Sequence, residues 1–499
     1  MTSATGAGPT RAENERRVAR LLDTEWGMLI NGQLCQAASG RTFDVLNPFT
    51  EARIATVPDG STQDVERAVS AAHEVSDAWG RRAATSRASL VYALADAIED
   101  MAEDFAVLDA VDGGAPVNVM RNDVEMALDS LRYFAGLARE IKGYTVPAST
   151  DLHFTERQPY GVVGKIIPFN HPFMFAASKI AAPLVAGNAV VLKPAEVTPL
   201  SALLLGKLAS TILPAGVLSV VAGNGPTVPD AIVRHPRVPR IGFTGSEATG
   251  RSIQRAAAEV AVKNVSLELG GKNALIAFPD ADPRAVAHGV VQGMNFTWSG
   301  QSCGSTSRLL VHDAIAEEVL ANVTPLVESR QLISPLDPGA VQGTMVNRRQ
   351  FDKVIGYIDG AVEQGAVVVT GGGRAAGVEQ GLFIAPTFLD NVAPDSPVAM
   401  EEIFGPVVSV IRWSDEEEAI RIANSVSYGL TASVYTNDIT RAHRVARRLE
   451  TGFVWINGAG PHFLGLPYGG WKNSGVGVEE GLDELLSYTR SKSVSVMLS

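Results

Sequence analysis

Between residues 161 and 243, short apolar runs alternate with stretches of helical periodicity. The strand-like runs are 162–167, 189–192, 218–221 and 240–243, and the helical runs between them are 173–185, 200–212 and 227–234. This alternation predicts parallel strands joined by helical crossovers, and hence a doubly wound α/β sheet. Ligands of such sheets bind beyond the carboxyl ends of the strands.

A second alternating unit runs from about residue 273 to 455. Its strand-like runs are 308–311, 367–369, 407–410 and 433–435. The economical interpretation is two Rossmann-like α/β domains that meet at a cleft.

The segments before residue 161 follow other patterns. Short strands with turns are expected over 25–57, followed by helices that begin near Ser61, over 86–108 up to Gly113-Gly114, and over 123–141. Residues 144–160 alternate without a helical period and predict an exposed hairpin that another subunit could cover. The polar, mixed-charge stretch Met1 to Arg20 has no signal-peptide core and is interpreted as a frayed tail.

Composition narrows the class of protein. The chain has 499 residues, of which 46% are hydrophobic and 19% charged, as expected for a globular protein of two or three domains. Its net charge of −12, without a long basic run, argues against a nucleic-acid partner. The most apolar region, 173–192, is interrupted by charged and polar residues and is not expected to span a membrane. Cys35 and Cys303 could pair, but so few cysteines fit a reducing, cytoplasmic location better.

Cys303 and Glu268 are the strongest candidates for chemistry. Cys303 follows Gly300-Gln301-Ser302, and a thiolate on a glycine-bounded loop can reach a substrate without steric screening. Glu268 ends an apolar run, and apolar surroundings raise a carboxyl pKa towards that of a general base. Taken alone, a buried structural cysteine and a helix-end glutamate are the commoner interpretations, so it is their combination that favours acyl-transfer chemistry.

Three stretches are candidates for a cofactor site. Lys193 and Glu196 follow a strand end, where they could hold an adenosine ribose and favour NAD over NADP, although a plain ion pair is an equally good interpretation. Gly245-Ser246 opens a helix whose amides could bind phosphate. Glu402 and Phe404 could hold the second ribose and pack near a nicotinamide ring. No Gly-x-Gly-x-x-Gly fingerprint and no metal site are found.

Together these stretches resemble the aldehyde dehydrogenase superfamily over residues 25–495. The matching motifs are Pro168-Phe169-Asn170, Lys193-Pro194-Ala195-Glu196, Phe243-Thr244-Gly245-Ser246, Leu267-Glu268-Leu269-Gly270-Gly271, Gly300-Gln301-Ser302-Cys303, Glu402-Ile403-Phe404-Gly405-Pro406 and Pro467-Tyr468-Gly469-Gly470-Trp471-Lys472-Asn473-Ser474-Gly475. Seven motifs in the family's order make a chance match very unlikely.

The resemblance implies a mechanism. Cys303 attacks the aldehyde carbon, while the Asn170 amide and the Cys303 backbone N–H hold the oxyanion. Hydride passes to NAD and leaves a thioester, which Glu268 helps water to hydrolyse. Lys179 and Glu479 match positions linked to proton relay in relatives. Implied cofactor contacts are Ile166, Pro168, Phe169, Lys193, Glu196, Gly225, Gly245, Ser246, Gly250, Leu269, Glu402 and Phe404.

The resemblance also implies an architecture. An NAD-binding domain would comprise 21–142 and 161–271, and a catalytic domain 272–465. The hairpin 143–160 would combine with 483–499, including a strand near 493–497, into a small β element that makes dimers or tetramers.

The chain departs from the family pattern around the catalytic loop. Phe169 stands where relatives often have Trp, and Trp298 replaces a commoner Asn. With Phe173 and Phe463 these side chains could line an aromatic tunnel, which favours a bulky apolar or aromatic aldehyde. Two other functions remain open: a CoA-acylating aldehyde dehydrogenase, in which Glu268 would be superfluous, and a catalytically silent binding or structural relative.

Overall fold

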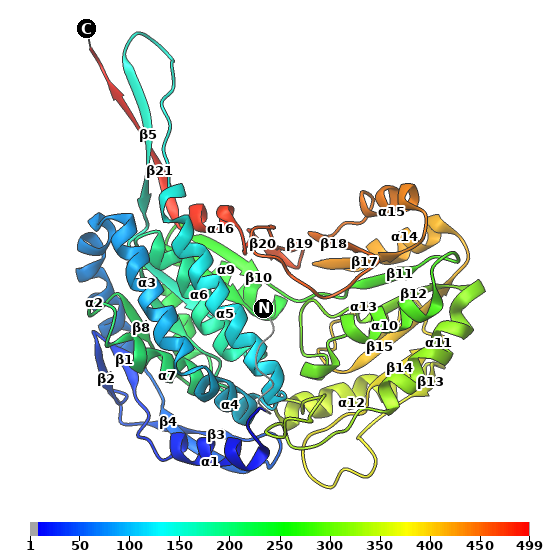
Figure 1. Ribbon diagram of the computed structural model, residues 1–499. Coiled ribbons are helices and arrows are strands. Elements are labelled where there is room, and N and C mark those ends of the chain that lie inside the picture. Colours follow the sequence, from blue (N-terminus) through cyan, green and yellow to red (C-terminus); the bar gives the residue numbers. More distant parts are fainter. Residues whose placement is uncertain (1–7, 499) are drawn as a thin grey trace.

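The computed structural model describes residues 8–498, which form two lobes and a projecting arm (Figure 1). One lobe is built on an eight-stranded sheet and the other on a seven-stranded sheet, while the arm is a two-stranded ribbon. The fold class predicted from the sequence, two Rossmann-like α/β units with a small β element, is confirmed. Residues 1–7 of the predicted tail and residue 499 lie outside the described part of the chain.

The eight-stranded sheet has five parallel strands at its centre. Its order is β2 (Gln33–Cys35), β1 (Met28–Ile30), β8 (Leu218–Val220), β7 (Ala189–Lys193), β6 (Val162–Ile166), β9 (Arg240–Thr244), β10 (Asn264–Glu268) and β20 (Gly475–Val476). Strands β8 to β10 in this order are parallel, and β1, β2 and β20 pair antiparallel at the two edges. Every residue of β6 and β7 is buried, as expected for strands covered by helices on both faces.

The seven-stranded sheet has a separate core on each face. Its order is β13 (Val367–Thr370), β14 (Thr387–Asp390), β15 (Val407–Trp413), β12 (Arg308–His312), β11 (Ala274–Ala277), β17 (Thr431–Tyr435) and β18 (Phe453–Ile456). Successive residues of β11 alternate between the cores: Ala274 and Ile276 join one, Leu275 and Ala277 the other. This alternation follows from the two-residue period of a strand.

The remaining elements cover the sheets, link them or form the arm. The helices are α1 (Arg11–Leu22), α2 (Thr62–Arg81), α3 (Ala84–Glu99), α4 (Ala102–Gly113), α5 (Val117–Gly136), α6 (Pro172–Val185), α7 (Leu200–Ala209), α8 (Thr227–Arg234), α9 (Glu247–Val260), α10 (Pro283–Gly293), α11 (Asp313–Glu328), α12 (Arg348–Glu363), α13 (Pro397–Met400), α14 (Glu416–Asn424), α15 (Ile439–Ala446) and α16 (Leu482–Ser487), with 3₁₀ turns at Leu137–Glu140 and Phe296–Trp298. Three two-stranded ribbons pair β3 (Thr42–Leu46) with β4 (Arg53–Pro58), β16 (Tyr428–Gly429) with β19 (Trp471–Lys472), and β5 (Leu152–Pro159) with β21 (Thr489–Val496). No helix of residues 8–498 is both long enough and apolar enough to cross a bilayer.

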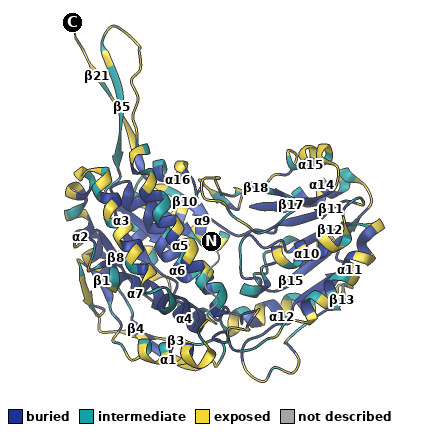
Figure 2. Ribbon diagram, viewed as in Figure 1, coloured by how far each residue is buried: buried dark blue, intermediate teal, exposed yellow. Residues whose placement is uncertain are grey.

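The arm joins two segments that are far apart in the sequence. Strand β5 pairs antiparallel with β21 from Leu152↔Val496 to Thr489↔Pro159, so the C-terminal strand begins before the predicted residue 493. Inside the predicted hairpin 144–160, an antiparallel bridge joins Thr145 to Phe154, and backbone hydrogen bonds flank it from Thr155 N to the Tyr144 carbonyl and from Val146 N to the His153 carbonyl. Figure 2 shows that the tip of the arm is exposed.

Two predictions about local structure are wrong. The helix expected over 86–108 is broken into α3 and α4 at Met101, whose φ of −113° and ψ of 14° leave the helical region. The stretch before Arg20 is not a frayed tail throughout, because α1 begins at Arg11. Thr10 and Glu13 form a reciprocal capping box that satisfies the first amides of α1.

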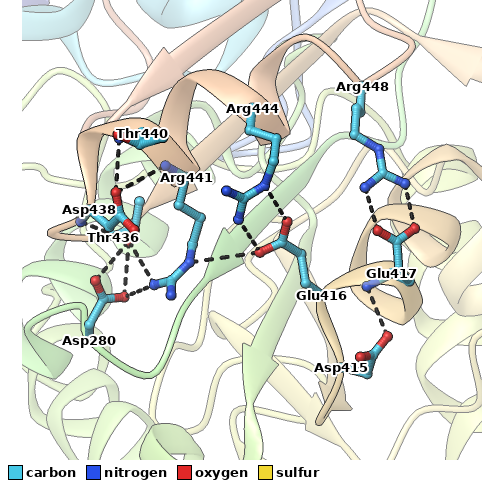
Figure 3. A network of polar contacts seen from close by, with 10 residues as sticks. All are labelled: Asp280, Asp415, Glu416, Glu417, Thr436, Asp438, Thr440, Arg441, Arg444 and Arg448. Atoms are coloured by element: carbon cyan, nitrogen blue, oxygen red, sulfur yellow. Dashed lines mark hydrogen bonds and ion pairs between the residues drawn. The ribbon is translucent and has the colours of Figure 1, made fainter.

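Ion pairs hold the outer layer of the second lobe (Figure 3). Arg444 on α15 pairs with Glu416 on α14 at 2.8 Å, and Arg441 contacts Asp280 after β11 at 2.9 Å. Exposed pairs of this kind are individually worth about 0–1 kcal/mol. Each pair therefore adds little to the stability of the lobe.

Candidate active site

The parallel register of the first sheet brings the predicted motifs to one edge. Ile166 at the end of β6 is opposite both Lys193 and Phe243, and Glu268 at the end of β10 is opposite Thr244. A cavity of about 590 Å³ lies beyond these strand ends. The predicted site residues that line it are Ile166, Pro168, Phe169, Asn170, Lys193, Glu196, Gly225, Gly245, Ser246, Glu268, Leu269, Cys303, Glu402 and Phe404.

Hydrogen bonds hold the loop that carries Cys303. The side chain of Gln301 accepts from Val346 N at 3.1 Å, and Asn273 Nδ2 donates to the Cys303 carbonyl at 2.7 Å. Gly300 has a φ of +65°, and a Cβ there would lie 2.4 Å from the Gly405 carbonyl oxygen, so this turn requires glycine. Cys303 is therefore held in a fixed position at the cavity wall.

Free donors lie near the sulfur. The backbone N–H of Cys303 and the side-chain amide of Asn170 have no acceptor among residues 8–498. Asn170 is 9% exposed and faces the same cavity as Cys303. Two unused N–H donors beside a nucleophile form a site that can stabilise an oxyanion.

The environment of Cys303 disfavours its anion. Burial raises the pKa of Cys303 to about 12, with further contributions from the carboxylates of Glu402 and Glu268, while Lys179 opposes the rise. The thiol therefore needs additional stabilisation to react as a thiolate.

Glu268 is placed as a carboxylate in an apolar wall. It is 6% exposed, and its Oε1 has no hydrogen-bond partner in the described part of the chain. Burial raises the pKa of Glu268 well above its ordinary value, and the negative charge of Glu479 adds to this effect. A carboxylate with a raised pKa and an unpaired oxygen can act as a general base.

Behind Glu268 lies a buried row of charged groups. Lys179 on α6 forms an ion pair with Glu479, which also lies 3.8 Å from Lys165. Lys165 in turn donates to the Tyr488 hydroxyl at 2.7 Å. Burial opposes the charge on Lys179, but the carboxylates of Glu479 and Glu484 outweigh it and raise the pKa of that ammonium. Lys179 and Glu479 lie behind the cavity wall and do not line the cavity.

The opposite part of the cavity carries the features expected for a dinucleotide. Lys193 is buried and lies 3.2 Å from the Glu196 carboxylate. Ser246 caps the fourteen-residue helix α9 by accepting from Thr249 N at 3.3 Å. A Cβ on Gly245 would lie 2.4 Å from the Phe243 ring, so this cavity-lining position requires glycine and presents backbone without a side chain.

Glu402 and Phe404 approach from the second lobe. Glu402 Oε1 accepts from Gly271 N at 3.0 Å, and burial raises the pKa of Glu402 to about 7. Phe404 has a φ of +59°, unusual for a non-glycine residue, and its ring meets Phe169 edge to face at 5.7 Å. Gln350 Nε2 donates to the Phe404 carbonyl at 2.9 Å and fixes this conformation.

Besides Lys179 and Glu479, four further predicted residues do not line the cavity. Phe173 is fully buried and stacks on Phe105 at 4.0 Å, because the residue two positions later, Phe175, turns to the cavity instead. Phe463 is 58% exposed on a loop. Trp298 packs against the first core and lies 4.9 Å from the ring of His171, and Gly250 packs under Leu269.

Cys303 packs against an aromatic cluster that no sequence motif predicts. Leu430, Phe453, Trp455 and Tyr468 form it; Phe453 and Trp455 lie on β18, and the other two lie outside the strands. Tyr468 was quoted as part of a motif, but its residue type alone gave no signal of contact with Cys303. Gln350 and Lys353 on α12 also line the cavity and were missed, because the pattern of α12 is that of an ordinary amphipathic helix.

A dinucleotide fits the residues present. The cavity combines a bare helix N-terminus, a lysine and carboxylates suited to ribose hydroxyls, and it extends to Cys303. Lys193, Glu196 and Ser246 would hold the adenosine and phosphate portion, and Glu402 the second ribose.

Comparison with known proteins agrees with this geometry. A profile of the "Aldehyde dehydrogenase family" matches residues 35–494. The chain is 45% identical over 467 residues to aldehyde dehydrogenase tropH of Talaromyces stipitatus, covering 91% of this chain and 90% of the relative. It is 39% identical to retinaldehyde dehydrogenase 3 of Mus musculus, covering 94% and 93%.

Solved structures give the same result. An aldehyde dehydrogenase from Bacillus cereus, solved as a complex with NAD+, is 40% identical with a TM-score of 0.94 and covers 97% of this chain and 99% of its own. An indole-3-acetaldehyde dehydrogenase of P. syringae is 35% identical with a TM-score of 0.95, covering 98% and 100%. The chain belongs to the aldehyde dehydrogenase family, whose members are oxidoreductases that act on aldehydes.

Proposed function

We propose that this protein is an NAD-dependent, hydrolytic aldehyde dehydrogenase that works through a covalent intermediate on Cys303. The observation that carries the proposal is that Cys303, Glu268 and Asn170 line one cavity together with the residues suited to a dinucleotide.

In the acylation half, the Cys303 thiol releases its proton to solvent, and the thiolate attacks the aldehyde carbon and forms a thiohemiacetal. The Asn170 amide and the Cys303 N–H donate to the developing oxyanion, an interaction typically worth a hundred- to a thousand-fold in rate, or roughly 3–4 kcal/mol, per donor. Bound NAD supplies the acceptor for the hydride that leaves the former aldehyde carbon. The acyl group then remains on Cys303 as a thioester.

In the hydrolytic half, Glu268 accepts a proton from water, which attacks the thioester carbon and releases the acid. The unpaired Oε1 of Glu268 is the atom available for that proton. Lys179 and Glu479, in the row behind Glu268, would pass the proton away from the cavity.

NAD is the proposed cofactor in preference to NADP. The Glu196 carboxylate beside Lys193 would repel a 2′-phosphate and would accept from ribose hydroxyls instead.

We infer a bulky apolar or aromatic aldehyde as the substrate. Support comes from the aromatic cluster against Cys303, whose Phe453 and Trp455 rings lie 4.8 Å apart. Phe175 adds an apolar wall to the cavity.

The apolar residues exposed on the arm favour a homodimer or homotetramer. The two free cysteines fit a cytoplasmic location.

Two variants test the mechanism. Cys303→Ala should abolish oxidation while NAD binding, followed by calorimetry, is retained. Glu268→Gln should accumulate acyl-enzyme, seen as a mass increment on the intact protein after one turnover. Cys35→Ala is the matched control and should remain active, because Cys35 lies outside the cavity.

The outcomes separate the possible functions. Full activity of Cys303→Ala would exclude the proposed chemistry. Product that forms only when CoA is added would indicate an acylating enzyme, and an intact protein that binds NAD without oxidising a panel of aldehydes would indicate a silent relative.

A further inference from the structure

Tyr468 is held rigidly beside the catalytic loop. Its ring lies 4.2 Å from that of His462 and 5.8 Å from that of Phe453. Its backbone N–H donates to the Glu479 carbonyl at 3.0 Å, and its carbonyl accepts from Glu479 N at 2.7 Å. Ring and backbone are thus both fixed, so the hydroxyl has a defined position.

The Tyr468 hydroxyl has no partner although it is buried. It makes no hydrogen bond within residues 8–498, and the residue as a whole is 6% exposed. A Cβ on Gly304, the residue after the nucleophile, would lie 3.4 Å from the hydroxyl oxygen. The Cys303 side chain packs against the cluster that contains Tyr468. Buried hydroxyls normally make a hydrogen bond, so this hydroxyl is available to bond an atom that becomes charged during the reaction.

We propose that the Tyr468 hydroxyl donates a hydrogen bond to the Cys303 sulfur in its anionic state, which makes Tyr468 a catalytic residue of this enzyme. The proposal rests on the proposed role of Cys303 as nucleophile.

The surrounding charges explain why such a donor is needed. Burial, Glu402 and Glu268 all disfavour the thiolate, and the ammonium of Lys179, which favours it, is paired with Glu479. Burial also raises the pKa of Tyr468, with Cys303, Glu480 and Glu268 adding to the rise. The phenol therefore keeps its proton and can only donate to an anionic sulfur.

The hydrogen bond would act twice in a turnover. Before attack it stabilises the thiolate, and the proton stays on the tyrosine oxygen while the sulfur electron pair forms the bond to carbon. When the thioester is hydrolysed, the C–S bond breaks and the same donor receives the returning thiolate. Charge-assisted bonds of this kind are about twice as strong as neutral ones.

Tyr468→Phe in a Cys35→Ala background tests the proposal, because Cys303 is then the sole thiol. The measurement is the rate of alkylation by iodoacetamide between pH 7 and pH 10, which reports the thiolate fraction. Loss of the donor should raise the thiol pKa by about one unit, so the rate should fall roughly tenfold at each pH. NAD binding and the unfolding midpoint should stay unchanged, and kcat should fall more than KM rises.

Tyr435→Phe in the same background is the matched control. Tyr435 is also a buried tyrosine of the second lobe, on β17, but its hydroxyl lies beside Gly289 of α10. It should leave the alkylation rate unchanged. An unchanged rate in Tyr468→Phe, or an equal fall in both variants, would overturn the proposal.

This test is independent of the test of function. The alkylation rate reports on the contact between Tyr468 and the sulfur even if Cys303→Ala were to keep full activity. Conversely, an unchanged alkylation rate removes the role of Tyr468 and leaves the role of Cys303 standing.

Discussion

At the scale of single residues, several carboxylates surround Cys303 and Glu268 and disfavour a negative charge on either group. Burial raises the pKa of both Cys303 and Glu268, and the carboxylates near them raise it further. Lys179 lowers the pKa of both groups, and it is itself paired with Glu479. The charge of Glu479 therefore influences when Glu268 can act as a base.

Glu479→Gln should move the pH dependence of hydrolysis. Glu268 acts when deprotonated, so the hydrolytic rate rises as pH passes upward through its pKa. Glu479 contributes to the raised pKa, so removing its charge lowers that pKa and shifts the rise to lower pH. Single-turnover acid release measured across pH checks this.

The exposed Glu140, which pairs with Lys142, provides the control as Glu140→Gln. Its pH profile should match that of the unmodified enzyme. A shift of the Glu479→Gln profile to higher pH would contradict the expected effect of the charge.

At the scale of elements, the turn between β9 and α9 joins the first sheet to the phosphate site. Gly245 N donates to the Glu268 carbonyl at 3.0 Å, so the same turn also fixes the end of β10. A disturbance at this turn should reach both the cofactor and the general base.

Gly245→Ala should therefore weaken NAD binding. Its Cβ would lie 2.4 Å from the Phe243 ring, which must then shift within the cavity wall. Overpacking of this kind costs about 1–3 kcal/mol, and if the NAD-bound state bears that cost, NAD affinity should fall by about five- to a hundredfold in calorimetry.

Gly360→Ala on α12 is the control for this substitution. A Cβ at Gly360 meets nothing within 4 Å, and alanine favours a helix, so NAD affinity should be unchanged. Equal NAD affinity in the two variants would show that the Gly245 turn tolerates a side chain.

At the scale of the whole molecule, the arm carries large apolar side chains that are exposed. Tyr144 is 64% exposed, and Met497 and Leu498 are each 68% exposed. An extended two-stranded ribbon is marginal in isolation, and its edges can pair with another chain. These exposed apolar residues support the proposal that the arm contacts a second copy.

A chain that ends after Ser491 should lose this contact. It lacks most of β21, so β5 loses its partner in the ribbon and the arm cannot hold its shape. Light scattering should give a lower mass than for the full chain, with the circular dichroism of both lobes retained. Lys492→Ala, which removes only an exposed ion pair with Glu156, should leave the mass unchanged; an unaltered mass in the truncated chain would place the subunit contact elsewhere.

Much of this molecule follows from local sequence. The buried strands β6 and β7 are predicted by short, largely apolar runs, as expected for strands covered on both faces. The helix α8 is predicted by the helical spacing of its apolar residues. The break between α3 and α4 could not be located, since Asp100 and Met101 are both compatible with a helix. The polar, mixed-charge composition of the stretch before Arg20 predicts a tail, although Thr10 and Glu13 form the capping box that starts α1.

The sequence by itself determined the motifs, the parallel sheet and hence the strand ends at which the cavity lies. The carboxyl ends of parallel strands lie at one edge of a sheet. Lys193, Gly245 and Glu268, which end or follow such strands, therefore lie at the same edge. Only the tertiary structure decided which aromatic side chains face Cys303. Phe173 and Phe175 sit on one helix with the same apolar character, and packing against Phe105 buries the first while the second reaches the cavity. Tyr468 likewise reaches the nucleophile from a loop 165 positions later in the chain, because contacts between distant segments depend on how the whole chain packs.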